Sequence, residues 1–144
     1  MAGKGATFTN DYLKLIFNGT PIANIADNAA SSPLTNLYMA LHTADPGSGG
    51  NQTTSEISYT GYARVAVVRT GSGWTVTNSS VSPTAAVDFG EMTGGTGGTA
   101  TYVSVGTASS GTGKILYSGA VTPSISVTTG VIPRIKTTST ITES

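Results

Sequence analysis

The sequence predicts a mainly-β fold, either a β-sandwich or a jelly-roll-like barrel of about eight strands, with a short N-terminal α-helix. The chain contains 25 Thr, 17 Ser and 19 Gly; Thr suits pleated strands, and Gly and Ser suit turns. Charged residues make up only 10% of the chain, against roughly 25% in ordinary soluble domains. From residue 37 onward, short alternating segments are separated by clusters of Gly, Ser, Pro and Thr, as expected for strands joined by turns.

The helix is expected to begin near Thr9 or Asn10, since either side chain can cap a helix N-terminus. Apolar residues then follow at i, i+3 and i+4 in one stripe: Leu13, Ile16 and Phe17. Asn18-Gly19 is a plausible stop signal. Residues 21–30 are expected to form another helical turn or a loop.

The strand signal begins at Leu37, where Leu37, Met39 and Leu41 alternate with residues of the opposite face. Further strands are expected at 63–69, 74–77, 85–89, 101–105, 115–121, 124–129, 131–136 and 139–142. Two Gly-rich loops stand out, at 43–58 and 91–100. Because they have little to pack, these loops are expected to be exposed and mobile and to offer contact surfaces.

A length of 144 residues predicts a single domain, divided into an N-terminal helical arm (1–35) and a β-sandwich (36–144). The seven basic residues equal the seven acidic ones, so no basic field favours nucleic acid as a partner. There is no cysteine, and neither a signal peptide nor a membrane-spanning stretch is visible. No nucleic acid, membrane or cofactor is therefore expected.

The segment from Ser109 to Lys114 partly matches a phosphate-binding loop. However, Ala108 occupies the position where that motif needs its first Gly, and the following residues predict a strand instead of a helix. A plain hairpin turn is the simpler interpretation.

Other chemistry is equally sparse. Asp45 and Glu56 have the spacing of the first and last ligands of a calcium loop, but no carboxylates lie between them. His42 is the only histidine, so it is expected to be structural or exposed at the surface. Asp88 and Glu91 are the only close pair of carboxylates, and a strand end followed by a turn explains them. No catalytic or metal-binding residue is assigned, and an enzyme is not expected.

Several segments together resemble a widespread family of small tailed-phage and prophage virion proteins. The resembling segments are 10–20, 37–46, Tyr59 with 61–64, Trp74, 102–106 and 113–120. Members are commonly labelled tail-fibre proteins, and similar β-rich proteins decorate phage capsids. The resemblance implies a structural role in the virion and transfers no catalytic residues.

We therefore expect a non-enzymatic component of a tailed-phage virion, made in the host bacterial cytoplasm. A capsid decoration or cement protein is favoured, because a fibre shaft would more often show sequence repeats. The alternative is a tail fibre or tail-tip protein that binds a host receptor, with host glycan as a ligand. Five aromatic residues could line a glycan-binding face, although core packing is the simpler expectation: Phe17, Trp74, Phe89, Tyr102 and Tyr117.

The expected partners are other copies of the chain, in a homo-oligomer, and neighbouring virion proteins, either the major capsid protein or tail proteins. The candidate contact residues lie on the helix stripe and in the first Gly-rich loop: Leu13, Ile16, Phe17, Asp45, Pro46, Gly47, Asn51 and Glu56. Packing of the stripe on the chain's own sheet is the alternative. Deletion of residues 47–52 is expected to weaken incorporation into virions and to leave folding intact.

Overall fold

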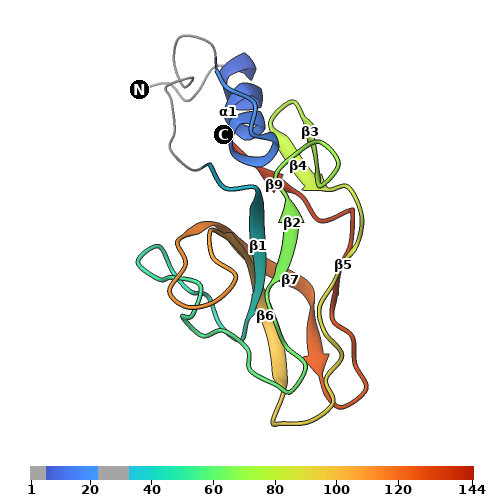
Figure 1. Cartoon of the computed structure of the whole chain (residues 1–144). Coiled ribbons are helices and arrows are strands. Elements are labelled where there is room, and N and C mark those ends of the chain that lie inside the picture. Colours follow the sequence, from blue (N-terminus) through green and yellow to red (C-terminus); the bar gives the residue numbers. More distant parts are fainter. Residues whose placement is uncertain (1–5, 23–32) are drawn as a thin grey trace. The chain divides into compact units, whose positions relative to one another are not determined.

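The computed structural model describes residues 6–22 and 33–144, and it confirms the predicted class: mainly β with one N-terminal helix (Figure 1). The elements are α1 (Ala6–Asn18), β1 (Asn36–His42), β2 (Val65–Val68), β3 (Trp74–Thr77), β4 (Ser80–Pro83), β5 (Val87–Asp88), β6 (Gly98–Gly106), β7 (Ile115–Val127), β8 (Arg134–Ile135) and β9 (Ile141–Thr142). The described strands form three open sheets, ordered β2-β1-β6-β7, β3-β4-β9 and β5-β8, and none closes into a barrel. Most of the turn or loop expected at 21–30 falls on residues 23–30, outside the described residues.

The chain groups into two compact units, each built from separate stretches of sequence. The first unit comprises residues 1–36, 67–86 and 136–144. Within its first stretch, the structure describes residues 6–22 and 33–36. The second unit comprises residues 37–66 and 87–135. The two units are described separately below, and single-domain behaviour stays a prediction.

In the first unit, α1 packs on the β3-β4-β9 sheet through its apolar stripe. Leu13 and Phe17 are fully buried, and the Phe17 ring meets Trp74 edge-on with centroids 4.8 Å apart. Val81 of β4 completes this core. The chain's own sheet therefore accounts for Leu13 and Phe17, whereas Ile16 is half-buried. The expected contact of the stripe with a neighbouring protein stays a prediction.

The helix begins earlier than its sequence suggested. Thr9 and Asn10 lie inside α1 because helical geometry already starts at Ala6. Asn10 instead donates from Nδ2 to the carbonyl of Asn78, at 2.9 Å. The expected end is confirmed: α1 stops at Asn18, and Gly19 adopts the left-handed conformation (φ 65°) that glycine tolerates best.

Arg69 holds the C-terminal end of α1. Its guanidinium donates to the carbonyls of Ile16 and Leu15, both at 2.6 Å, and to that of Leu34 at 3.2 Å. The last carbonyls of a helix lack partners within the helix, and they lie at the negative end of its dipole. One cationic side chain thus satisfies two helix carbonyls and joins the helix to the segment that leads into β1.

In the second unit, β1 is buried on both faces. The expected inward residues Leu37, Met39 and Leu41 are 2%, 3% and 0% exposed. On the opposite face, Ala40 and His42 are also fully buried. This strand lies between β2 and β6 in its sheet, and the loop that follows it covers its second face, as shown below.

The β6–β7 hairpin is the longest pairing of the second unit (Figure 1). The sequence predicted two strands at 115–121 and 124–129, but the structure has one strand, β7, because both parts pair antiparallel with β6. The register shifts between Ala100 and Tyr102 and again at Val105 and Gly106, so β7 carries extra residues opposite β6. β6 also begins at Gly98, inside the loop expected at 91–100.

Candidate contact surface

The loop after β1 is held tightly, contrary to the expectation of a mobile loop. Thr43 N–H donates to Ser55 C=O at 2.8 Å, and Ile57 N–H donates to Leu41 C=O at 2.9 Å. The chain therefore leaves β1 at Thr43 and returns alongside it. These backbone bonds close the base of the loop.

Gln52 anchors the middle of this loop. Its side chain is fully buried; Nε2 donates to Tyr38 C=O at 3.1 Å, and Oε1 accepts from Ala108 N–H at 3.0 Å. Its backbone N–H donates to Gly113 C=O at 2.9 Å. A Cβ at Gly106 would lie under 3.0 Å from three atoms of the Gln52 side chain. The amide thus fills a space that depends on residue 106 being glycine.

His42 is a structural histidine. Its Nδ1 lies 2.8 Å from Thr54 C=O, and its Nε2 lies 2.8 Å from Ser104 Oγ. A neutral ring that carries its proton on Nδ1 satisfies both contacts, because it donates to the carbonyl and accepts from the hydroxyl. Burial lowers the pKa of His42 below its ordinary value of 6.5, although the bond to Thr54 and the charge of Glu56 act in the other direction. Both ring nitrogens are therefore occupied within the protein.

Glu56 and Arg64 form a buried ion pair. Arg64 Nε and Nη2 donate to the two carboxylate oxygens of Glu56, each at 2.8 Å, and their side chains are only 3% and 16% exposed. Tyr62 Oη also donates to Glu56, at 2.8 Å, and accepts from Leu41 N–H. Burial raises the pKa of Tyr62, so its hydroxyl stays protonated. The hydrogen bond to Glu56 raises the pKa of Arg64, so the guanidinium stays charged.

The turn at 109–114 is a hairpin turn, as the simpler interpretation predicted. Arg64 Nη1 donates to Ala108 C=O at 3.0 Å, and Nη2 donates to Gly111 C=O at 2.7 Å. A phosphate-binding loop presents N–H groups to its ligand, whereas this turn presents carbonyls to an arginine.

Two of the other carboxylates that the sequence singled out, Asp45 and Asp88, are likewise bonded within the chain. Asp45 Oδ1 accepts from Gly47 N–H at 2.9 Å and closes a local turn. Asp88 pairs with Arg134 across β5 and β8 at 2.5 and 2.7 Å. The hydrogen bonds from Arg134 lower the pKa of Asp88. Within residues 6–22 and 33–144, no cluster of three His, Cys, Asp or Glu side chains could hold a metal ion.

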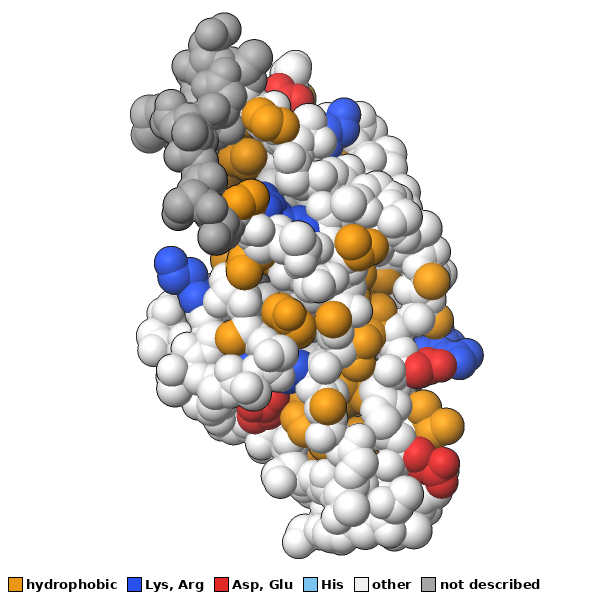
Figure 2. Space-filling view, in the orientation of Figure 1, with side chains coloured by type: hydrophobic (Ala, Val, Ile, Leu, Met, Phe, Trp, Pro, Cys, Tyr) orange, Lys and Arg blue, Asp and Glu red, His pale blue; other side chains and the backbone are white. Residues whose placement is uncertain are grey.

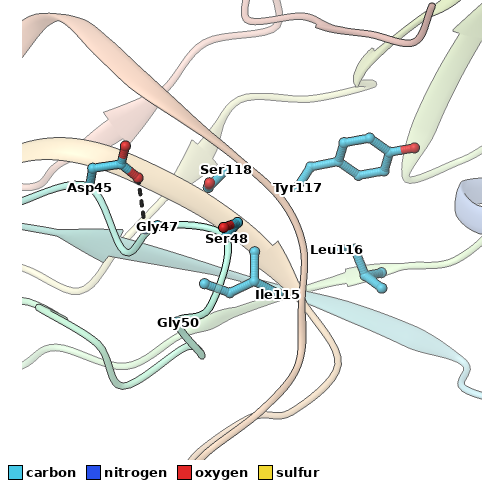
Figure 3. Close-up of a pocket in the computed structure, with 8 residues that line it drawn as sticks. All are labelled: Asp45, Gly47, Ser48, Gly50, Ile115, Leu116, Tyr117 and Ser118. Atoms are coloured by element: carbon cyan, nitrogen blue, oxygen red, sulfur yellow. Dashed lines mark hydrogen bonds between the residues drawn. The ribbon is translucent and has the colours of Figure 1, made fainter.

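The exposed part of the loop borders a shallow pocket of about 360 Å³. The loop lines one side of it and the start of β7 lines the other, with these residues: Asp45, Gly47, Ser48, Gly50, Ile115, Leu116, Tyr117 and Ser118. Figure 3 shows Ile115 and Ser118 on the side of the β7 ribbon nearer the loop, and Leu116 and Tyr117 on its other side. The pocket has no titratable side chain other than Asp45 and Tyr117, so it offers a contact surface and little chemistry.

The candidate residues of the loop therefore differ in exposure. Asp45 and Gly47 are exposed at the pocket rim, and Pro46 beside them is buried. Asn51 is half-buried, and its Oδ1 accepts from the backbone and hydroxyl of Thr53. Glu56 is committed to its ion pair with Arg64. We call residues 45–50 the loop tip. It contains Asp45 and Gly47, the exposed members of the predicted contact set in this loop, and its contact with a neighbour stays a prediction.

Three of the five aromatic residues considered for a glycan-binding face belong to the core, as the simpler expectation held: Phe17, Trp74 and Phe89, which are 0%, 1% and 2% exposed. Tyr102 and Tyr117 are half-buried. Most of the surface shown in Figure 2 is uncharged, with small and separate groups of acidic and basic side chains. No helix of the described residues is long and apolar enough to cross a bilayer.

No local sequence pattern indicated the roles of Gln52, Arg64 and Tyr62. Arg64 falls within the strand expected at 63–69, but it lies just before β2 and is 9% exposed. Its two carbonyl partners are 44 and 47 residues away in the chain. Only the fold brings these groups together, so no local spacing could have predicted the contacts.

The sequence model of one protein family, described as "Podophage GP4 fiber I protein gp80", matches residues 7–143. No curated protein matches the chain significantly.

Proposed function

The chain belongs to the family of podophage GP4 fiber I protein gp80, and from this premise we propose that it is a non-enzymatic subunit of a phage fibre. The observation that carries the proposal is the extent of the match, which takes in all but a few residues at each end of the chain. The expected virion structural role follows from the family. The family favours the fibre alternative, and capsid decoration stays an untested expectation.

Hydrogen bonds and ion pairs that occupy polar side chains within the chain support a non-catalytic role. His42, Glu56 and Asp88 each have close partners within the chain. A general acid or base must reach the proton of a substrate, and these groups are occupied by structural contacts. In this proposal the chain acts through its surface, by contacts with copies of itself and with neighbouring virion proteins.

Location in the virion tests the proposal directly. Gold-labelled antibodies against the purified protein should bind at the fibres of intact virions, and quantitative mass spectrometry should find far fewer copies than of the major capsid protein. Labelling distributed over the capsid, with a copy number approaching that of the capsid protein, would replace the fibre proposal with capsid decoration.

The loop tip is the surface that we propose contacts a virion neighbour. The deletion of residues 47–52 is no longer a suitable test, because it would remove buried Gln52 and disturb folding. Gly49 is exposed, and a Cβ there would meet no atom within 4 Å. Gly71, in a turn of the first unit, is equally open and serves as a matched control.

Gly49→Lys and Gly71→Lys should both melt like the wild type, since neither position is packed. Only Gly49→Lys should reduce incorporation into virions, measured by complementation of a phage that lacks the gene. Equal incorporation of the two variants would remove the loop tip from the proposal and leave the fibre assignment standing.

A further inference from the structure

One edge of the four-stranded sheet is open. β7 is the last strand in the order β2-β1-β6-β7, and its residues pair with β6 on one side. On its other side, it pairs with no strand among residues 6–22 and 33–144. At 13 residues, β7 is the longest strand within the part of the chain that the structure describes. An open edge presents a row of backbone N–H and C=O groups that can pair with another chain.

The middle of β7 is accessible from both faces of the sheet. Ser118, Gly119 and Ala120 are consecutive and all exposed. Because neighbouring residues in a strand point to opposite faces, this exposure shows that neither face is covered there. A Cβ at Gly119 would meet no atom within 4 Å. The loop lies against the start of β7, from Ile115 to Ser118, in the pocket of Figure 3.

The edge lacks the charges that usually prevent edge-to-edge pairing. Between Glu91 and Arg134, Lys114 is the only charged residue of the sequence, and β7 itself has none. Natural proteins commonly protect an open edge with lysine, proline, bulges or a covering segment. Pro123 and the register shift beside it protect the second half of β7. The segment from Ser118 to Ala120, which pairs with β6 without a register shift, has neither protection.

We propose that this edge pairs with the same edge of a second copy, β7 against β7, antiparallel about a two-fold axis near Gly119. A two-fold contact uses the same patch on both copies. In this register Gly119 faces Gly119, and Ser118 faces Ala120, so small uncharged side chains meet. An uncharged strand meets its own copy without like-charge repulsion, whereas it offers no counter-charge to a charged partner strand. The contact would join the two four-stranded sheets into one.

The proposed β7 contact rests on one part of the proposed function, namely that the chain contacts copies of itself. Its test uses purified protein, so the location of the protein in the virion does not affect the result. The probes are Gly119→Lys and Gly119→Glu, which place a charge at the proposed axis, and Gly119→Thr, which adds an uncharged side chain suited to strands. Gly71→Lys controls for a charge added to another open glycine.

Light scattering coupled to size exclusion should report a dimer of the 14.4 kDa wild-type chain at protein concentrations up to roughly 100 µM. Gly119→Thr and Gly71→Lys should remain dimeric. The dissociation constant of Gly119→Lys should rise about tenfold or more, because like charges directly opposite each other destabilise paired strands. An equimolar mixture of Gly119→Lys and Gly119→Glu should form mixed dimers, which a misfolded variant would not do.

A wild-type monomer across that concentration range would overturn the proposal and point to a strand of a different virion protein as the occupant of the edge. A Gly119→Lys variant as dimeric as Gly119→Thr would also overturn it, because the contact would then lie elsewhere. Failure of the Lys and Glu variants to associate with each other would have the same meaning.

Discussion

The fit between Gln52 and Gly106 can be tested by changing each residue alone and both together. Gln52→Ala leaves Tyr38 C=O and Ala108 N–H without their partner. Each buried polar group that loses its partner costs about 1–3 kcal/mol, so with two such groups this variant should lose about 2–6 kcal/mol of unfolding free energy. Gly106→Ala should lose about 1–3 kcal/mol, because its Cβ overlaps the Gln52 side chain.

The double variant should be no less stable than Gln52→Ala alone, since the shortened side chain frees the space that the new Cβ needs. Urea denaturation of the four proteins measures the coupling, which should be favourable by at least about 1 kcal/mol. Gly119→Ala serves as the control, because its Cβ meets no neighbour and should show no coupling to residue 52. Costs that add within about 0.5 kcal/mol would refute the steric reasoning.

Two further predictions concern other single residues. Arg69→Ala should lower the melting temperature and weaken protection of the amides at the end of α1 in hydrogen exchange, because the Leu15 and Ile16 carbonyls lose their donor; unchanged protection would argue against the anchoring role. For His42, burial lowers the folded-state pKa, so between that value and 6.5 the unfolded state binds more protons and stability falls as the pH falls. His42→Gln should be less stable at neutral pH and should lose that part of the pH dependence, and an identical slope below pH 6.5 would exclude His42 as its source.

The sequence predicted those elements whose information is local. The alternation of Leu37, Met39 and Leu41 located β1, and the strand expected at 74–77 is β3 to the residue. The hairpin turn at 109–114 also followed from its own residues, since Ala108 and the strand after Lys114 do not fit a phosphate loop. In each case the pattern lies within about ten residues, which is the range over which side-chain periodicity is informative.

The features that sequence reasoning missed depend on partners far along the chain. The Ser and Pro residues of β4 are typical of a turn. The segment nevertheless forms a strand, because it pairs with β3 and β9. The loop at 43–58 reads as mobile because it is rich in Gly, yet Gln52 meets Ala108, 56 residues away. The sequence does not distinguish a buried glutamine or arginine from an exposed one. Only the fold therefore shows that Gln52 anchors this loop.

The division of the chain into interleaved units has a consequence for its synthesis. The second unit is complete once Ile135 has been made, but the first still lacks β9, which pairs with β4 near residue 80. A ribosome therefore releases α1, β3 and β4 long before the last strand of their sheet is available. Because contacts between distant residues form slowly, the first unit is expected to finish folding after translation, and a nascent chain stalled before Ile141 should be digested by protease within this unit while residues 37–66 and 87–135 are protected.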